Sequence, residues 1–389
     1  MGMAKRMMEE AETRMFWPSG DRICADHLHD AFLRTRLAPA RYDTCCVACG
    51  LRTSSVDLDD LMEIVVASLQ TNRRRAVDDL YLDRESKSGY ALATVVDTSD
   101  AVMNDLIDAV DVQVAELIAE RLQDEGWFDP GELWLIGTEL MSSGWTNFVD
   151  WIKGKSIDLA DIEHEPLPDQ WMGEQADGIP PSRLLAQLIK VFDSTGALIE
   201  LPPAAWYRIT YLSPEEPRTA ARLGAPPIEF ATRPNRFSQV GVSAFYCASE
   251  PGTAFAETPR DALRDPVLSK WTPSRPLNVV DLTRLPRVPS YWDTDRTNER
   301  HWLTILQGFS ADVSIPIGPD DKVRDYRPTQ AVSHAIRQWG KADGIVFASS
   351  KTGTPNCVLF INNSQCVDAA QPNARDLLLV LEETAQGGS

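Results

Sequence analysis

The chain has 389 residues, enough for two or three domains, and its formal net charge is -19 at pH 7. This charge argues against nucleic acid or an anionic membrane surface as the main partner, because binding to phosphate groups needs clustered lysine and arginine. Hydrophobic residues make up 43% of the chain, as in ordinary globular proteins, and no apolar run approaches the roughly 18 residues of a membrane span.

The N-terminal residues lack the apolar core of a secretory signal. The seven cysteines are odd in number and unevenly spread, which does not indicate a disulfide framework. We therefore predict a cytoplasmic protein. A local basic pocket can exist even in an acidic protein, so an anionic small molecule remains a suitable ligand.

Four candidate metal ligands lie within the first fifty residues. Cys24 and His27 form a C-x-x-H pair, and Cys46 and Cys49 form a C-x-x-C pair. This spacing is typical of a small tetrahedral structural zinc site, whose closed ligand shell leaves no open position for catalysis. The alternative is a set of reduced thiols, with His27 and His29 on the surface. The neighbouring Cys45 leaves the fourth ligand ambiguous.

The next hundred residues have the apolar period of helices. Three helices are expected: one capped by Ser55, one that Asp100 opens and Gly126 ends, and one over residues 133–152 that is broken by Ser142, Ser143 and Gly144. We predict a mostly α-helical domain over residues 1–155. Prolines and acidic residues without a sustained period then predict a linker over residues 156–181.

The period changes to that of strands in the last part of the chain. A helix capped by Ser182 and ended by Gly196 comes first. Strands are expected at residues 206–211, 242–247, 278–282, 344–348 and 357–361, an edge strand at 377–381, and short helices from Pro251 and over 329–339. Residues 182–389 therefore form a mixed domain, and the fold class is α+β.

The stretch from Trp206 to Glu257 and a later serine pair combine residue types suited to one pocket: Arg208, Arg236, Tyr246, Glu257, Ser349 and Ser350. Arginine suits bidentate recognition of phosphate, and tyrosine can stack on a flat heterocycle. A carboxylate can stabilise an oxocarbenium-like centre. Taken singly, each residue has a structural explanation, since a strand arginine is usually an ion-pair residue. Together they predict a pocket for an anionic, aromatic small molecule.

The order of these residues resembles the RES domain, a family named for its recurring Arg, Glu and Ser. The resemblance rests on W-Y-R-I at 206–209, N-R-F-S-x-x-G-x-S-A-F-Y-C-A at 235–248, A-F-A-E-T at 254–258, D-G-I-V-F-A-S-S at 343–350, N-C-V-L-F at 356–360 and the helix start Y-R-P-T-Q at 326–330. It covers roughly residues 204–360. Ser238, Gln239 and Phe347 depart from the usual Asn, Pro and Tyr.

The resemblance implies a fold related to ADP-ribosyltransferases and an enzyme that cleaves NAD+ at the nicotinamide–ribose bond, by hydrolysis or phosphorolysis. Such an enzyme would act as a toxin or defence effector. The implied roles are pyrophosphate binding by Arg208 and Arg236, stacking by Tyr246, stabilisation of ribosyl charge by Glu257, and a hydrogen bond to the substrate from Ser349 or its neighbour Ser350. NAD+ would be a substrate, so a G-x-G-x-x-G fingerprint is not needed.

The N-terminal region resembles the HEPN-like helical domain with Cys/His knuckles that precedes some RES domains. This resemblance implies a regulatory domain, and an antitoxin or other regulatory protein as a partner; a homo-oligomer is left open. The helical region lacks the R-x-x-x-x-H pair of HEPN ribonucleases, so ribonuclease activity is not supported. Two alternatives remain: an ADP-ribosyltransferase that modifies a macromolecule, and a non-enzymatic interaction module.

Overall fold

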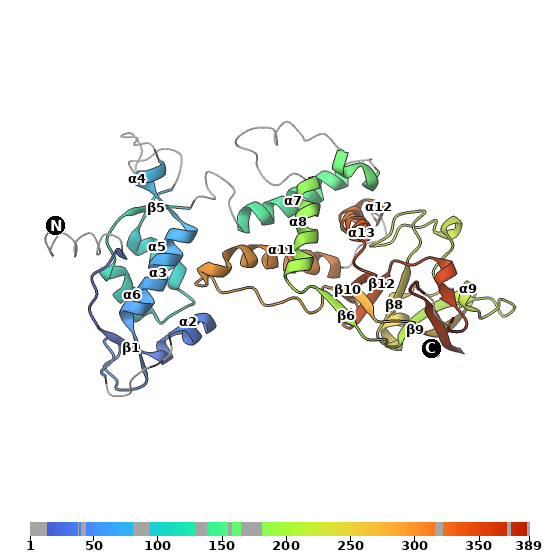
Figure 1. Cartoon of the computed structure of the whole chain (residues 1–389), viewed down its shortest axis with the longest axis horizontal. Helices are drawn as coiled ribbons and strands as arrows, with labels where there is room; N and C mark the ends of the chain where they lie inside the picture. The colour runs from blue at the N-terminus through green and yellow to red at the C-terminus, as the bar shows by residue number, and fades with distance from the viewer. Residues whose placement is uncertain are drawn as a thin grey trace. The chain divides into compact units, whose positions relative to one another are not determined.

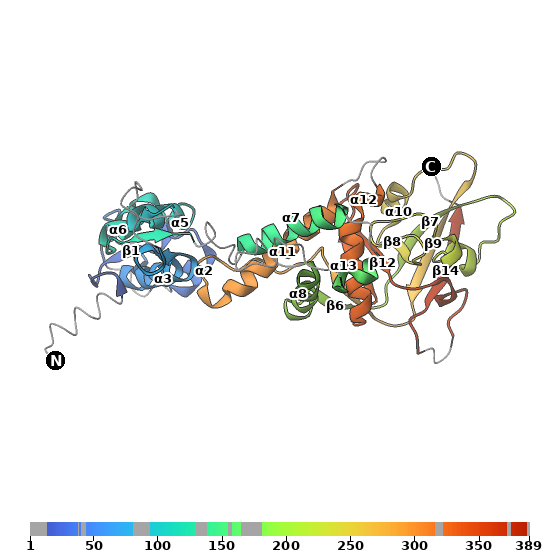
Figure 2. The same ribbon diagram turned by 90° about the horizontal axis from the view of Figure 1, so that it is seen from above.

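The computed structural model describes residues 14–37, 39, 44–80, 94–129, 138–154, 158–164, 181–315, 322–371 and 375–386. The chain divides into two compact units, whose elements are drawn in Figures 1 and 2. Unit 1 comprises Met1–Glu139 and Val288–His301, and unit 2 comprises Leu140–Arg287 and Trp302–Ser389. Most of the predicted linker at 156–181 lies outside the described residues.

Unit 1 consists of short strands and helices around one core. In chain order these elements are β1 (Arg22–Cys24), η1 (Ala25–His27), α2 (Ala31–Arg36), β2 (Ser55–Asp57), α3 (Leu58–Asn72), β3 (Arg74–Arg75), α4 (Ala76–Asp79), β4 (Val96–Asp97), α5 (Thr98–Leu106), α6 (Val112–Arg121) and β5 (Gly126–Phe128). Strand β1 pairs antiparallel with β2, and β5 lies between β3 and β4. The helical apolar period expected for this region is confirmed in α3, where Leu61, Met62 and Val65 are all buried.

The starts and breaks of the predicted helices are partly wrong. Asp57 caps α3, while Ser55 pairs in β2. The second predicted helix is two helices, α5 and α6, because Val110 forms a β-bridge with Leu28 between them. Gly126 begins β5 instead of ending a helix.

The segment Val288–His301 belongs to unit 1 although it is distant in sequence. Trp292 is 4% exposed and lies in the core of unit 1. The Tyr291 hydroxyl donates to Asp105 Oδ2 at 3.0 Å, and Arg300 Nη2 donates to Asn72 Oδ1 at 2.7 Å. These side chains complete the core of unit 1 with residues that local periodicity in the first part of the chain cannot reveal.

Unit 2 contains one large sheet with helices around it. Its elements are α7 (Thr138–Gly154), η3 (Leu159–His164), α8 (Pro181–Ser194), β6 (Leu198–Leu201), β7 (Trp206–Leu212), α9 (Ala220–Leu223), η5 (Ile228–Phe230), β8 (Phe245–Ala248), α10 (Pro251–Glu257), β9 (Asp265–Pro273), β10 (Leu277–Asp281), α12 (Lys322–Asp325), α13 (Arg327–Trp339), β11 (Gly344–Ala348), β12 (Pro355–Leu359), η7 (Asn363–Gln365), β13 (Cys366–Val367) and β14 (Leu379–Gln386). Helix η6 (Thr294–Arg296) lies in the segment assigned to unit 1, and α11 (Thr297–Ser314) begins there and continues into unit 2. The predicted break in α7 at Ser142–Gly144 is wrong: the helix is continuous.

Among the described residues, the sheet of unit 2 has nine strands in the order β13-β14-β9-β7-β8-β12-β11-β10-β6, which confirms the α+β class. Strand β11 has its predicted bounds, and β7 and β10 differ from theirs by one residue. Strand β9 was not predicted, because Ser269 and Lys270 interrupt its apolar residues and a proline lies near each of its ends. Strand β14 is not the edge strand, since the short β13 lies beyond it.

The nine-stranded sheet is weakly joined between β7 and β8. Seven residue pairs join β7 to β9, from Trp206 to Leu212. Within these described strands, β7 and β8 share one pair, Tyr207 with Ala248. Helix α10 packs against both strands at this junction (Figure 2), where Ala254 meets Ile209 and Ala248 in a small apolar cluster. The junction therefore leaves room for a cavity between two halves of the sheet.

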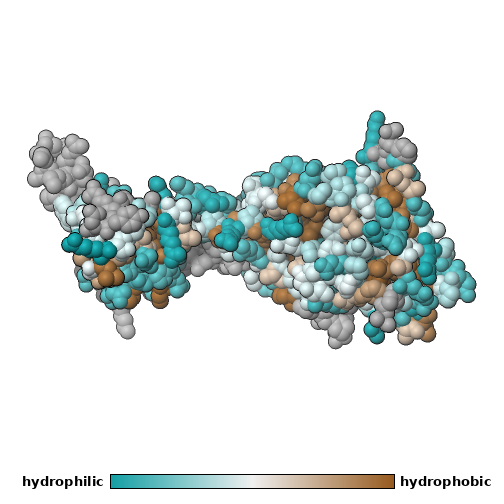
Figure 3. Space-filling view, turned by 90° about the horizontal axis from the view of Figure 1, so that it is seen from below, coloured by the Kyte–Doolittle hydropathy of each residue, from teal (hydrophilic) through white to brown (hydrophobic). Residues whose placement is uncertain are grey.

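Figure 3 shows hydrophilic residues over most of the face that it presents, with apolar residues in separate patches. Among the residues that the structure describes, no helix combines the length and the apolarity needed to cross a membrane.

Candidate active site

A cavity of about 500 Å³ lies at the junction of β7 and β8. Five of the predicted site residues line it: Arg208, Arg236, Tyr246, Glu257 and Ser350. They come from β7, the loop before β8, β8, the end of α10 and the residues after β11. Cavities of about 300–1,000 Å³ commonly bind small molecules. The structure thus brings together side chains that are as much as 142 residues apart in sequence (from 208 to 350).

Glu257 is the last residue of α10 and is held by two side chains. Its Oε1 accepts a hydrogen bond from Ser349 Oγ at 2.5 Å and another from Asn356 Nδ2 at 2.9 Å. Ser349 is 4% exposed and Asn356 is 6% exposed. The partial negative charge at the C-terminal end of a helix disfavours a carboxylate. The hydrogen bonds from these two donors stabilise the carboxylate in its place. Both bonds use Oε1, which leaves Oε2 with no partner among the described residues.

Ser349 and Ser350 have different environments. The Ser349 hydroxyl donates to Glu257 and accepts hydrogen bonds from the backbone N–H groups of Lys351 at 3.1 Å and Thr352 at 3.2 Å. One donor and two acceptor positions are the full capacity of a hydroxyl. Ser349 therefore fixes Glu257 and offers no free position to a ligand. Ser350 is exposed and lines the cavity.

Three threonines tie α10 to the turn between β11 and β12. Thr253 of α10 hydrogen bonds to Thr352 at 3.0 Å and also to Thr354. The turn closes at Gly353, whose φ of +75° is the left-handed conformation that favours glycine. Because α10 carries Glu257 and this turn begins at Ser349, the threonine cluster sets the distance between the carboxylate and its donor.

The Tyr246 hydroxyl is anchored to the loop before its own strand. It accepts a hydrogen bond from the backbone N–H of Phe237 at 3.1 Å and forms a second bond with Ser238 Oγ at 3.1 Å. Burial raises the pKa of Tyr246 to about 12, so the phenol is neutral at physiological pH. The ring itself lines the cavity.

Helix α13 holds the same loop through three buried polar side chains. Thr329 Oγ1 donates to the carbonyl of Arg236, Gln330 Nε2 to that of Asn235 at 2.8 Å, and Ser333 Oγ to that of Phe237 at 2.8 Å. These bonds use backbone carbonyl oxygens of the loop and none of them involves the Arg236 guanidinium, which lines the cavity. Thr329 and Gln330 belong to the Y-R-P-T-Q stretch.

Two arginines contribute positive charge to the cavity. Arg236 Nη2 donates to the carbonyl of Ile315 at 2.7 Å, and its guanidinium lies 5.8 Å from the ring centre of Tyr326. Nη1 of Arg208 is buried without a hydrogen-bond partner in the described part of the chain, and the guanidinium lies 5.0 Å from the ring centre of Phe245. Burial lowers the pKa of both arginines. Neither pairs with a carboxylate among the described residues, which makes the cavity a suitable anion site.

Two further residues of the cavity were not identified from the sequence. Asn356 binds Glu257 directly, and its signal was its place as the first residue of N-C-V-L-F. Lys351 lines the cavity, and its Nζ donates to the carbonyl of Ala256 next to Glu257. No local pattern distinguishes a buried asparagine with this function from an ordinary strand residue.

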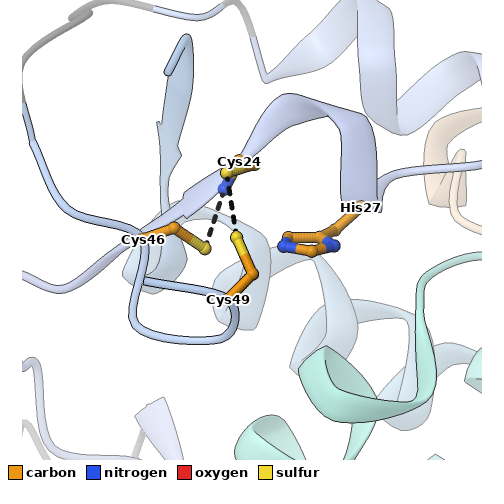
Figure 4. A group of neighbouring side chains, drawn as sticks. All are labelled: Cys24, His27, Cys46 and Cys49. Carbon is orange, nitrogen blue, oxygen red and sulfur yellow. Dashed lines mark hydrogen bonds between the residues drawn. The ribbon is translucent and has the colours of Figure 1, made fainter. Parts of the chain in front are cut away.

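The four predicted metal ligands also come together, in unit 1. One ligand atom from each of Cys24, His27, Cys46 and Cys49 lies within 4.8 Å of the others. Figure 4 shows the three thiols and the imidazole ring pointing toward one another. Zinc–sulfur bonds of about 2.3 Å in a tetrahedron place sulfur atoms about 3.8 Å apart, and Cys24 Sγ lies 3.5 Å from Cys49 Sγ. The donor set and its spacing fit a zinc ion.

The structure also decides between Cys45 and Cys46. Cys46 is buried, and its Sγ accepts a hydrogen bond from the backbone N–H of Cys24 at 3.3 Å. Cys45 is exposed, and its thiol donates to the carbonyl of Gly50 at 3.1 Å. The cluster therefore contains the second cysteine of the doublet.

Comparisons with known proteins match two parts of the chain to known families. The RES domain family matches residues 205–382, and the family HEPN/RES N-terminal domain 1 matches residues 40–157. Among solved structures, the crystal structure of the M. tuberculosis MbcT–MbcA toxin–antitoxin complex matches at 18% identity and a TM-score of 0.32, covering 51% of this chain and 91% of that chain. No curated protein matches. The chain therefore carries a RES domain over residues 205–382 and a HEPN/RES N-terminal domain over residues 40–157.

Proposed function

We propose that unit 2 cleaves NAD+ at the nicotinamide–ribose bond, and that the protein is a toxin-like or defence effector. The observation that carries this proposal is the Glu257 carboxylate, which two buried donors hold at the wall of the cavity. Arg208 and Arg236 line the same cavity without carboxylate partners among the described residues. The match to the RES domain family supports the same activity.

The proposed reaction breaks the bond between the anomeric carbon of the ribose and the nicotinamide nitrogen. Nicotinamide leaves as a neutral base with the bonding electron pair, and positive charge develops on the ribose. Glu257 stabilises this charge more strongly in the transition state than in the ground state, which accelerates the step. Water then bonds to the anomeric carbon and releases ADP-ribose and a proton; inorganic phosphate in place of water gives phosphorylated ADP-ribose.

The other cavity residues take binding and positioning roles in this proposal. Arg208 and Arg236 bind the pyrophosphate, and the Tyr246 ring stacks on the nicotinamide or its ribose. Ser349 and Asn356 act through Glu257, because both donate to its carboxylate. Ser350 is the serine whose exposure allows direct contact with the substrate.

The proposal is tested with the purified full chain and NAD+, with free nicotinamide and remaining NAD+ measured by chromatography. We expect Glu257→Gln to lower the rate by about 100-fold or more, as for loss of a preorganised electrostatic group. The matched control is Glu250→Gln, since Glu250 is an exposed acid immediately before the same helix. Absence of nicotinamide release by the wild type, or full activity of Glu257→Gln, contradicts the proposal.

Parallel measurements show whether water, phosphate or a macromolecule accepts the ADP-ribosyl group. Reactions with and without inorganic phosphate distinguish hydrolysis from phosphorolysis by their products. Labelled ADP-ribose on protein or RNA would instead indicate a transferase. The NAD+ level in cells that express the wild type or Glu257→Ala tests the effector role, and an unchanged NAD+ pool contradicts it.

An enzyme that depletes NAD+ must be restrained in the cell that makes it, so the proposal includes restraint by an antitoxin-like partner or by unit 1.

We also propose that the Cys24–His27–Cys46–Cys49 cluster holds one structural zinc ion. Four protein ligands fill a tetrahedral shell and leave no position for a substrate. The ion would stabilise unit 1 by joining the β1–η1 segment to the turn at residues 46–49, and its binding energy would contribute to folding. Elemental analysis of the purified chain should give one zinc per chain.

A further inference from the structure

Asp111 occupies the N-cap position of α6 but does not cap it. An aspartate in this position usually accepts a hydrogen bond from a backbone N–H of the first turn. Three other helices of unit 1 begin in that way: Asp30 caps α2, Asp57 caps α3 and Asp97 caps α5. The Asp111 carboxylate makes no capping hydrogen bond to its own helix, so its other contacts are what orient it.

These contacts are with two histidines. Asp111 Oδ2 lies 2.5 Å from His27 Nδ1, and Oδ1 lies 2.9 Å from His29 Nε2. The backbone makes a parallel connection, because the Asp111 N–H donates to the carbonyl of His27 at 3.0 Å. The start of α6 is therefore joined to the His27 segment by both side chain and main chain.

The bond to Asp111 determines which nitrogen of His27 can bind a metal. A neutral imidazole that donates through Nδ1 carries its lone pair on Nε2. His27 Nε2 is buried and has no hydrogen-bond partner in the part of the chain that the structure describes. This nitrogen belongs to the residue whose ring points toward the three thiols in Figure 4. A buried lone pair beside three sulfur atoms is well placed to be the fourth ligand.

We propose that Asp111 is the positioning residue of the metal centre: it orients His27 so that Nε2 binds the ion, and His29 holds Asp111 from its other side. The inference rests on the zinc ion proposed above. A carboxylate behind a metal-binding histidine fixes the ring and raises its basicity. His29 does not belong to the cluster of candidate ligands, and its Nε2 bonds to Asp111. Asp111 thereby connects the metal to α6.

The test measures zinc affinity on the full chain. Metal is removed with a chelator, and zinc is titrated back against a chromogenic competing chelator. We expect Asp111→Asn and Asp111→Ser to bind zinc about 10- to 100-fold more weakly than the wild type, the usual cost of losing such a partner. Asp108→Asn is the control, since Asp108 is an exposed acid three residues earlier. It should bind zinc as the wild type does.

The serine variant separates helix capping from metal binding. Serine is as good an N-cap residue as aspartate, so Asp111→Ser leaves α6 with a residue that is able to cap it, while His27 loses its partner. Wild-type zinc affinity in Asp111→Ser and Asp111→Asn would overturn the role of Asp111 alone. A wild-type chain that binds no zinc would overturn the zinc ion itself.

Folding of each variant is checked by circular dichroism at saturating zinc. If both Asp111 variants fail to fold, His29→Gln decides the question, because it leaves Asp111 and α6 in place and removes one of the two histidines that hold the carboxylate. A several-fold loss of zinc affinity in His29→Gln then supports the inference, and unchanged affinity overturns it.

Discussion

The Ser349 hydroxyl donates a 2.5 Å hydrogen bond to Oε1 of Glu257, although the two residues are 92 positions apart in sequence. The same hydroxyl accepts two backbone N–H bonds from the turn that follows β11. Ser349 thus connects the turn after β11 to the C-terminal end of α10, where Glu257 lies. In the proposed reaction, a serine in this position acts through the carboxylate and need not touch the substrate.

Ser349→Ala should therefore lower kcat for NAD+ cleavage with little change in KM. A hydrogen bond to a charged group contributes about 1.5–3 kcal/mol, which corresponds to a rate loss of about 10- to 150-fold. The neighbouring substitution Ser350→Ala is the matched comparison, and its effect should fall on KM, because Ser350 lines the cavity. Steady-state kinetics on both variants checks this. The assignment of the two serines is wrong if the effects are reversed.

Asn356→Asp should change the pH dependence of the reaction. It places a second carboxyl group where an amide now lies 2.9 Å from Glu257 Oε1. Two carboxylates at that distance cannot both ionise easily, so the pKa of one of them rises. The acid limb of the kcat/KM profile should then move to higher pH, with a lower rate at neutral pH. Asn356→Ala provides the comparison without the added charge. An acid limb that does not move in Asn356→Asp contradicts this geometry.

Tyr246→Phe should destabilise the protein by about 1–3 kcal/mol, because the N–H of Phe237 loses its acceptor. Urea unfolding measures the change, and Tyr211→Phe is the control, since no hydrogen bond of the Tyr211 hydroxyl occurs in the described structure.

The folded-state pKa of Tyr246 is raised from 10.0 to about 12. Its stabilising contribution is therefore complete below pH 10 and is lost as the pH rises toward 12. The wild type should lose stability relative to Tyr246→Phe across that interval.

Arg208→Met should make the protein more stable and less able to bind NAD+. The Arg208 guanidinium is buried, with Nη1 unpartnered among the described residues, and an unpaired buried polar group costs about 1–3 kcal/mol. Methionine has a similar length and no charge. Chemical denaturation should show a higher free energy of unfolding, and kinetics should show a higher KM. A variant that is destabilised and binds NAD+ normally would contradict the assignment of Arg208 to the anion site.

Cys46→Ser should remove the zinc ion, and Cys45→Ser should leave it in place. The two cysteines are adjacent, but Cys46 is buried in the cluster and Cys45 is exposed. Elemental analysis should give one zinc per chain for the wild type and Cys45→Ser, and much less for Cys46→Ser. Calorimetry should show that Cys46→Ser, or treatment of the wild type with a strong chelator, lowers the melting temperature of unit 1. Equal zinc content in the two variants contradicts the choice of ligand.

Much of this protein could be predicted from local patterns in the sequence. The helical and strand periodicity of apolar residues predicts the α+β class, and the predicted bounds of β11 match the observed bounds. The order of the motifs selected Arg208, Arg236, Tyr246 and Glu257 before their positions were known. The spacing of Cys24 and His27 relative to the C-x-x-C pair indicated a shared site. These features depend on residues close in the chain or on a fixed order of short motifs. Both can be recognised from the sequence without the structure.

The tertiary structure alone decided which side chains touch. It assigned Ser349 to Glu257 and Ser350 to the cavity, added Asn356, and paired Asp111 with His27. It also showed the single pair that joins β7 to β8, which makes room for the cavity. Each of these facts depends on the register between segments up to about a hundred residues apart. Local conformational preference does not determine that register; the packing of the whole unit does.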